Sequence, residues 1–143
     1  MTTKQVMVYI MTEPTKITTV AELERELGGF IGTVNYYTCF PPGVYLTDGI
    51  NYVADRVGAH WLFSDVSILI KGKYKTVPFQ VWSLDVRSDK TARLTLREDT
   101  GQPLLHDQTI KCTDFPVGTF EFWVVQGYIK QVNDFVIMLK SEY

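Results

Sequence analysis

The sequence predicts an α+β domain in which N-terminal helices pack on one face of an antiparallel meander of about five or six strands. Two observations support this class. Apolar residues recur every three or four positions before the lysine-rich stretch at 71–75, and every second position after it. Helices therefore precede strands, an order typical of segregated α+β domains rather than of alternating βαβ units. The 143 residues fit a single domain spanning 1–143, with residues 1–17 as a candidate N-terminal strand extension.

The first predicted elements are a short strand and an amphipathic helix. Val6–Met11 is apolar and partly β-branched, and Pro14 ends it. Thr19–Glu22 fits a capping box, in which a threonine and a glutamate three residues later satisfy free amides at a helix start. Apolar residues then fall on one helical face until the glycine pair at 28–29 ends the helix.

Two further helices are predicted after an extended region. Gly32–Phe40 is rich in Thr, Val and Tyr, and Val44–Leu46 is short and extended. Thr47 or Asp48 then caps a helix whose apolar residues repeat at helical spacing until a glycine ends it. Ala59–Ile70 follows as a third helix. Because this segment is apolar on most sides, we expect it to be the most buried helix.

The second half of the chain is expected to form five strands. Thr91–Arg97 alternates between apolar and polar residues, so one face of this strand should be buried and the other wet. Turns are expected at 87–90 and 99–101. The many large aromatic residues imply that both sheet faces are covered, or that some rings form an interface. The predicted strands are Phe79–Val86, Thr91–Arg97, Leu104–Cys112, Phe120–Val125 and Phe135–Leu139.

The charge of the chain argues against a nucleic-acid partner. The formal net charge is −2 and the pI is near 5.6, whereas DNA-binding domains usually carry a basic surface. The densest cationic stretch, Lys71, Lys73 and Lys75, is interpreted as a solvated loop rather than a phosphate-binding patch. The aromatic run at 120–123 resembles a base-stacking platform, but its acidic neighbours favour core packing.

The composition predicts no metal site and no cofactor. A structural zinc ion needs four ligands, whereas the chain has two cysteines, Cys39 and Cys112, and two histidines, His60 and His106. The cysteines are far apart in the sequence, so we expect two buried thiols in a reducing compartment. No apolar run reaches the roughly 18 residues that span a bilayer, and no signal peptide is recognised. We therefore expect a cytoplasmic protein of a bacterial host cell that does not contact the membrane.

The run Thr47–Gly49, at a predicted helix start, is the sharpest local feature. Helix N-termini attract anions, so Asp48 and nearby tyrosine hydroxyls are candidates for a pocket, while the simpler interpretation is an N-cap. His60 is the candidate general base. Its simpler interpretation is a packed histidine that hydrogen-bonds a backbone carbonyl, with Trp61 in the core. The pocket candidates are Tyr36, Tyr37, Tyr45, Asp48 and His60.

No arrangement of residues predicts a particular reaction. Neither cysteine lies on a sharp strand-turn-helix elbow. A nucleophilic set of Cys39, His60 and Asp48 is not selected by the spacing of these residues. The sequence also lacks a glycine-rich phosphate loop and a metalloprotease histidine pair. We therefore assign no catalytic residue and favour a non-enzymatic protein.

Six short runs follow one another in a recognisable order: Phe30–Thr33, Tyr36-Tyr37, Leu46–Gly49, Gly58–Leu62, Phe79–Trp82 and Thr113–Pro116. With the C-terminal Lys140–Tyr143, the pattern resembles a family from bacteria, plasmids and phages catalogued as domain of unknown function 6876. The resemblance covers residues 20–143 and leaves the first 17 residues as an addition. The family's Pro-Ser-Glu-Tyr ending is here Lys-Ser-Glu-Tyr. The resemblance implies no activity.

Three functions remain open. The first is a protein-binding module of a phage or mobile element, for example a stoichiometric inhibitor of a host defence complex, because a compact acidic domain carries surplus aromatic residues and no catalytic set. The second is a small-molecule or nucleotide-related binding protein or enzyme with a site near Tyr45, Asp48 and His60. The third is a structural, self-associating protein. The interface candidates are Trp123, Tyr128, Tyr143, Glu121 and Asp134.

Overall fold

The computed structural model describes residues 15–129 and 133–143. This part of the chain forms three α-helices and one seven-stranded sheet, which confirms the α+β class. The predicted strand Val6–Met11 lies outside the described residues. The elements are α2 (Val20–Glu26), η1 (Leu27–Gly29), β1 (Tyr37–Thr38), β2 (Val44–Leu46), α3 (Asp48–Arg56), α4 (His60–Gly72), β3 (Phe79–Val86), β4 (Ala92–Arg97), β5 (His106–Ile110), β6 (Gly118–Gln126), β7 (Phe135–Met138) and η2 (Lys140–Glu142).

Two of the three helices, α2 and α3, begin where their capping residues predict. At α2 the N–H of Glu22 donates to the Thr19 hydroxyl at 3.2 Å, and the N–H of Thr19 donates to the Glu22 carboxylate at 3.0 Å. This is the reciprocal pair of a capping box. At α3 the hydroxyl of Thr47 accepts from the N–H of Ile50 at 3.3 Å, so Thr47 is the N-cap and Asp48 is the first helical residue.

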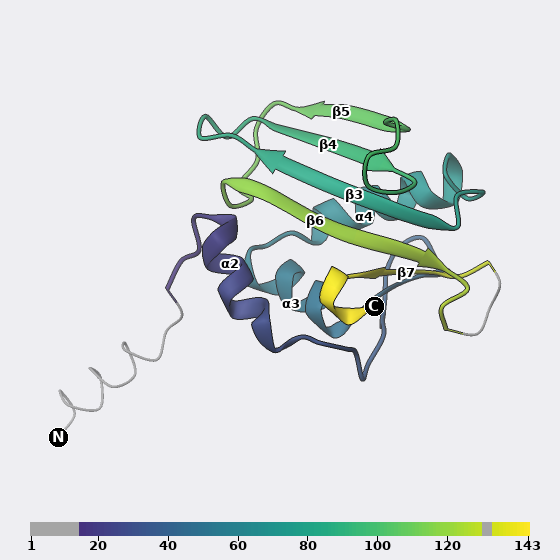
Figure 1. The fold of residues 1–143 in the computed structure, drawn as a ribbon. Helices are drawn as coiled ribbons and strands as arrows, with labels where there is room; N and C mark the ends of the chain where they lie inside the picture. The colour runs from purple at the N-terminus through teal and green to yellow at the C-terminus, as the bar shows by residue number, and fades with distance from the viewer. Residues whose placement is uncertain (1–14, 130–132) are drawn as a thin grey trace, which may run out of the picture.

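The sheet is larger than predicted, and its order interrupts the meander. The strands lie in the order β1-β2-β7-β6-β3-β4-β5 (Figure 1). After β5 the chain returns to the other side of β3, so β6 lies beside β3 and not beside β5. Strand β7 then pairs with β6 on one side and, in parallel, with β2 on the other. The short extended segments of the first half therefore join the sheet and raise the count to seven.

One sheet face packs against the helices and forms the main core. Residues at even positions of β3 and β6, such as Trp82 and Phe122, are fully buried there together with residues of α2, α3 and α4. Phe63 of α4 meets Phe122 edge-on, with ring centroids 5.4 Å apart. The position of α4 behind the sheet is visible in Figure 1. This arrangement agrees with the prediction that helices cover one face.

A buried polar network lies where α4 connects to β3. The side-chain oxygen of Gln80 accepts from the Trp82 indole N–H at 2.8 Å. The amide nitrogen of Gln80 donates to the carbonyls of Tyr74 and Val77, each at 3.0 Å. The Tyr74 hydroxyl in turn lies 2.8 Å from Nδ1 of His106 on β5. Each of these buried polar groups has a partner, so the glutamine in the run Phe79–Trp82 has a structural role.

The outer face of the sheet carries a second, smaller apolar cluster. Val81 of β3 faces Trp123 of β6, which faces Met138 of β7, and all three lie on the face opposite the helices. Val81, Val136 and Met138 are buried although they lie outside the core cluster that the described α-helices form with the sheet. The chain after β7 turns back at η2, which contacts β6. On the same sheet face, the ring of Tyr143 packs against the ring of Trp123.

The expectation of an extended segment before β2 is met by a strand over only part of its length, and the expectation for Cys112 is wrong. Of the extended segment Gly32–Phe40, only Tyr37 and Thr38 pair as a strand. Cys112 was expected to be a buried thiol but is exposed, because it lies just beyond the end of the edge strand β5. Cys39 is half-buried, with its sulfur 3.3 Å from the Ser67 hydroxyl.

Candidate functional site

The N-terminus of α3 binds the C-terminal turn η2 through a buried carboxylate. Glu142 of η2 is only 4% exposed, and its carboxylate accepts three hydrogen bonds. The Thr47 hydroxyl donates at 2.6 Å, the Gly49 N–H at 2.9 Å and the Leu139 N–H at 2.9 Å. A carboxylate at a helix N-terminus is also favoured by the helix dipole. Thr47 and Gly49 are therefore explained by the attachment of the C-terminal turn to this helix.

Asp48 holds the loop that precedes β1. Its carboxylate accepts from the N–H of Val34 at 2.8 Å, the N–H of Asn35 at 3.4 Å and the hydroxyl of Tyr37 at 3.1 Å. The hydrogen bond from Val34 is the largest cause that lowers the pKa of Asp48, so this side chain is ionised at neutral pH. The N–H of Asp48 donates to the Thr33 hydroxyl at 2.8 Å.

A groove of about 790 Å³ runs along α3 beside this loop. Asp48, Asn51, Tyr52 and Asp55 occur at positions i, i+3, i+4 and i+7, so they share one face of the helix. The groove brings together two of the five pocket candidates, Tyr37 and Asp48. The residues that line it are Phe30, Val34, Asn35, Tyr37, Asp48, Asn51, Tyr52, Asp55 and Arg56.

The other three pocket candidates lie elsewhere. Tyr45 pairs with Val136, on the outer face of the sheet. Tyr36 adjoins Tyr37 in extended backbone and therefore points to the opposite side. Burial raises the pKa of Tyr36, with a smaller contribution from nearby Tyr128. His60 is exposed, with Nε2 2.7 Å from Asp55, so the interpretation as a packed histidine is wrong.

The outer face gathers three of the five interface candidates. Trp123, Tyr128 and Tyr143, together with Phe79, form what we call the aromatic surface. Tyr143 lies at the centre of this group, with ring centroids 5.5 Å from Trp123, 5.8 Å from Phe79 and 6.1 Å from Tyr128. Tyr143 is 63% exposed and Tyr128 is 38% exposed. The indole N–H of Trp123 is buried and has no hydrogen-bond partner in the described part of the chain.

The remaining interface candidates differ in their surroundings. Glu121 lies two residues before Trp123 on the same strand face and forms an ion pair with Lys140 at 3.3 Å. Asp134 is half-buried before β7, and its carbonyl accepts from the Gly127 N–H at 2.7 Å. Among the contacts of the described residues, none joins Asp134 to the aromatic rings.

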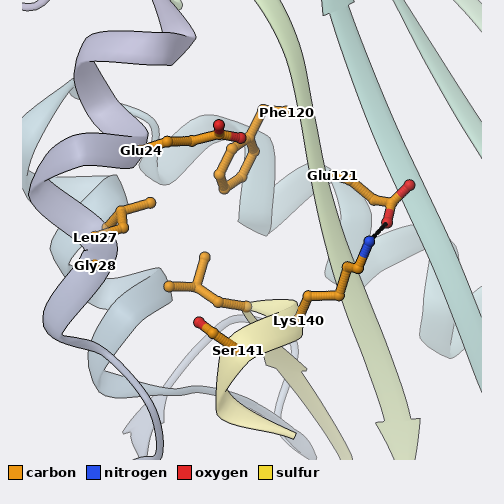
Figure 2. Close-up of a pocket in the computed structure, with 8 residues that line it drawn as sticks. Glu24, Leu27, Gly28, Phe120, Glu121, Lys140 and Ser141 are labelled. Atoms are coloured by element: carbon orange, nitrogen blue, oxygen red, sulfur yellow. Dashed lines mark ion pairs between the residues drawn. The ribbon is translucent and has the colours of Figure 1, made fainter.

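A second groove adjoins Glu121. It lies between the end of α2, strand β6 and the C-terminal turn η2. Figure 2 shows the ion pair between Lys140 and Glu121 at its rim. Its volume is about 420 Å³. The lining residues are Glu24, Leu27, Gly28, Phe120, Glu121, Leu139, Lys140 and Ser141.

A family model described as a family of unknown function, DUF6876, matches residues 21–143. The chain belongs to this family. The match extends from α2 to the end of η2 and so covers both the groove along α3 and the aromatic surface. No curated protein and no solved structure matches the chain.

The nucleophilic set and the metal-ligand groups considered from the sequence are not assembled within residues 15–129 and 133–143 of the DUF6876 domain. These ranges contain no group of three or more His, Cys, Asp or Glu residues placed to hold a metal ion. Cys39, His60 and Asp48 do not form a set, because their hydrogen bonds go to Ser67, Asp55 and the loop at 33–37. None of the described helices is both long and apolar enough to span a bilayer.

Sequence reasoning did not find Glu142, Asn51, Tyr52 or Asp55. Asn51, Tyr52 and Asp55 could have been found from their spacing, because residues three, four and seven positions after Asp48 lie on the same helical face as Asp48. No local signal marks Glu142 as the partner of Gly49, because 93 positions separate the two residues.

Proposed function

We propose that this domain is a non-enzymatic protein-binding module that engages its partner through the aromatic surface. The observation that carries the proposal is the clustering of four rings on the sheet face opposite the described α-helices. The rings come from β3, β6, the turn after β6 and the C-terminal residue. Tyr and Trp are enriched at the centres of protein interfaces because they bury a large area at a small cost in side-chain entropy.

The strand residues beneath the aromatic surface favour binding. Val81, Val136 and Met138 are buried beside Phe79 and Trp123, so these two rings rest on strands of the sheet, and the ring of Tyr143 packs against both. A surface held in place before binding loses less conformational freedom when the partner arrives. The buried Trp123 N–H, which has no acceptor among the described residues, is also a donor that a partner carbonyl can satisfy if binding exposes it.

The finer form of the proposal is a module of a phage or mobile element that inhibits a host defence complex stoichiometrically. It is supported by the net charge of −2, because an acidic domain can occupy a basic nucleic-acid channel. Glu121, beside the rings, supplies a carboxylate that can pair with a basic side chain of the partner.

The test is an affinity pulldown from bacterial lysate, before and after nuclease treatment. We compare the wild type, the double variant Tyr128→Ala/Tyr143→Ala and the control Phe40→Ala. Phe40 is 71% exposed and lies outside the aromatic surface. A stoichiometric protein that survives nuclease, is retained by Phe40→Ala and is lost from the double variant would support the proposal.

Three outcomes would contradict the proposal. No protein is enriched, or nuclease abolishes the enrichment, or the double variant binds as well as the wild type. Light scattering at high protein concentration tests the self-association alternative separately. A dimer that is lost in the double variant would assign the aromatic surface to a second copy of this chain.

A further inference from the structure

We infer that the groove along α3 binds an organic cation, an ammonium or guanidinium group carried on an aliphatic chain. The groove lies on the helical side of the domain, whereas the aromatic surface lies on the outer face of the sheet. The inference is therefore independent of the proposed protein-binding function, and each can fail without the other.

Two carboxylates of α3 lie at opposite ends of the groove. Asp48 occupies the first position of α3 and Asp55 the eighth, so they share one face about 10 Å apart along the axis. Oδ1 of Asp55 contacts His60, and its other oxygen has no partner among the described residues. Asp48 accepts three hydrogen bonds of roughly four that a carboxylate can accept.

Aromatic side chains form the walls between these carboxylates. The rings of Phe30 and Tyr52 are 5.3 Å apart between centroids, and Tyr37 lines the groove from the loop side. The face of an aromatic ring attracts a cation that lies within about 6 Å of its centre. The side-chain amide of Asn51, between the two aspartates, provides a neutral hydrogen-bonding group.

The one cationic residue in the lining does not oppose a cationic ligand. The guanidinium of Arg56 donates to both oxygens of Glu26, at 2.8 Å and 3.1 Å. It also donates to the carbonyl of Thr15. The charge of Arg56 is thus balanced by Glu26, and Asp48 and Asp55 leave the groove with a negative charge. A cation is the complementary ligand.

The experiment is a titration of the full chain followed by backbone and side-chain amide NMR. The probes are spermidine, as a free polyamine, and N-acetyl-arginine amide, as the side chain of a protein partner. The neutral control is N-acetyl-glutamine amide. We expect saturable shifts at Val34, Asn35 and the Asn51 side chain with at least one cationic probe, and none with the neutral one. The probe that saturates at lower concentration identifies the source of the cation.

Two charge-neutralising variants test the site. In Asp55→Asn the Kd is expected to rise about tenfold, which corresponds to the loss of one ionic contact. Asp65→Asn removes the same charge from the exposed side of α4 and is expected to leave Kd unchanged. Equal weakening by both variants, shifts spread over all acidic residues, or equal binding of the neutral control would overturn the inference. The amide spectra of the free variants verify that both are folded.

Discussion

The backbone N–H of Gly49 donates to Oε2 of Glu142 at 2.9 Å, across 93 positions of the sequence. This bond and the one from Thr47 attach the C-terminal turn to the start of α3. Two of the short runs that carry the family resemblance meet at this point. Thr47, Gly49 and Glu142 are thus accounted for by the joining of distant segments.

The first prediction concerns the buried carboxylate. Glu142→Gln replaces one acceptor oxygen with an NH2 group that faces backbone and hydroxyl donors, so at least one donor loses its partner. We expect the free energy of unfolding to fall by about 1–3 kcal/mol, measured by urea denaturation. The control is Glu98→Gln, which alters an exposed side chain. Equal denaturation midpoints for the two variants would contradict this role.

The second prediction concerns the space beside Gly49. A Cβ at this position would lie 2.4 Å from Cδ1 of Leu139 and 2.7 Å from Oε1 of Glu142. We expect Gly49→Ala to lower the free energy of unfolding by about 1–3 kcal/mol, because the turn must move to admit the methyl group. Gly28→Ala is the matched control, since no atom lies within 4 Å of its Cβ position. Equal losses in the free energy of unfolding for the two variants would contradict the role of Gly49 in admitting the C-terminal turn.

The third prediction concerns the buried polar network. Gln80→Leu is close in volume but leaves the indole N–H of Trp82 and the Val77 carbonyl without partners, whereas the Tyr74 carbonyl keeps the N–H of Val77. We expect a loss of about 1–3 kcal/mol per unsatisfied buried group. Thermal unfolding is the measurement, with Gln102→Leu, at an exposed position, as the control. A stable Gln80→Leu variant would show that water replaces the glutamine.

The fourth prediction concerns pH. Hydrogen bonds from Val34, Asn35 and Tyr37 lower the pKa of Asp48 in the folded state. A group of this kind stabilises the fold above its unfolded pKa of about 3.9, and that stability is lost as the pH falls through the folded pKa. We therefore expect Asp48→Asn to be less stable than the wild type near neutral pH. The difference in urea midpoint should shrink below about pH 4, and a difference that is constant with pH would contradict the ionic contribution.

Local signals explain why so much of the fold was predicted. The capping box at Thr19 and the threonine cap at Thr47 fix two helix starts through contacts within a few residues. The alternation of Thr91–Arg97 likewise gives the buried face of β4 directly. The predicted strand Phe79–Val86 agrees with β3 at both ends.

The remaining features depend on contacts that the sequence does not display. The position of β6 beside β3 is decided by packing of whole strands, so the interruption of the meander has no local signal. Tyr36 and Tyr37 are adjacent in the chain, but their side chains point to opposite faces of the sheet. Which face each one takes is set only when the short strand β1 pairs with β2. The clustering of Trp123, Tyr128 and Tyr143 depends on the direction of the C-terminal turn.

The position of β7 also constrains how the domain is synthesised. Residues 135–138 fill the gap between β2, near the start of the chain, and β6. These residues follow the other six strands of the sheet in the sequence, so during translation β2 and β6 have no common neighbour and their edges are open until β7 is made. Contacts of such long sequence separation form slowly. The sheet can therefore close only after β7 has left the ribosome, and a polypeptide that stops before residue 135 would be a substrate for chaperones and proteases.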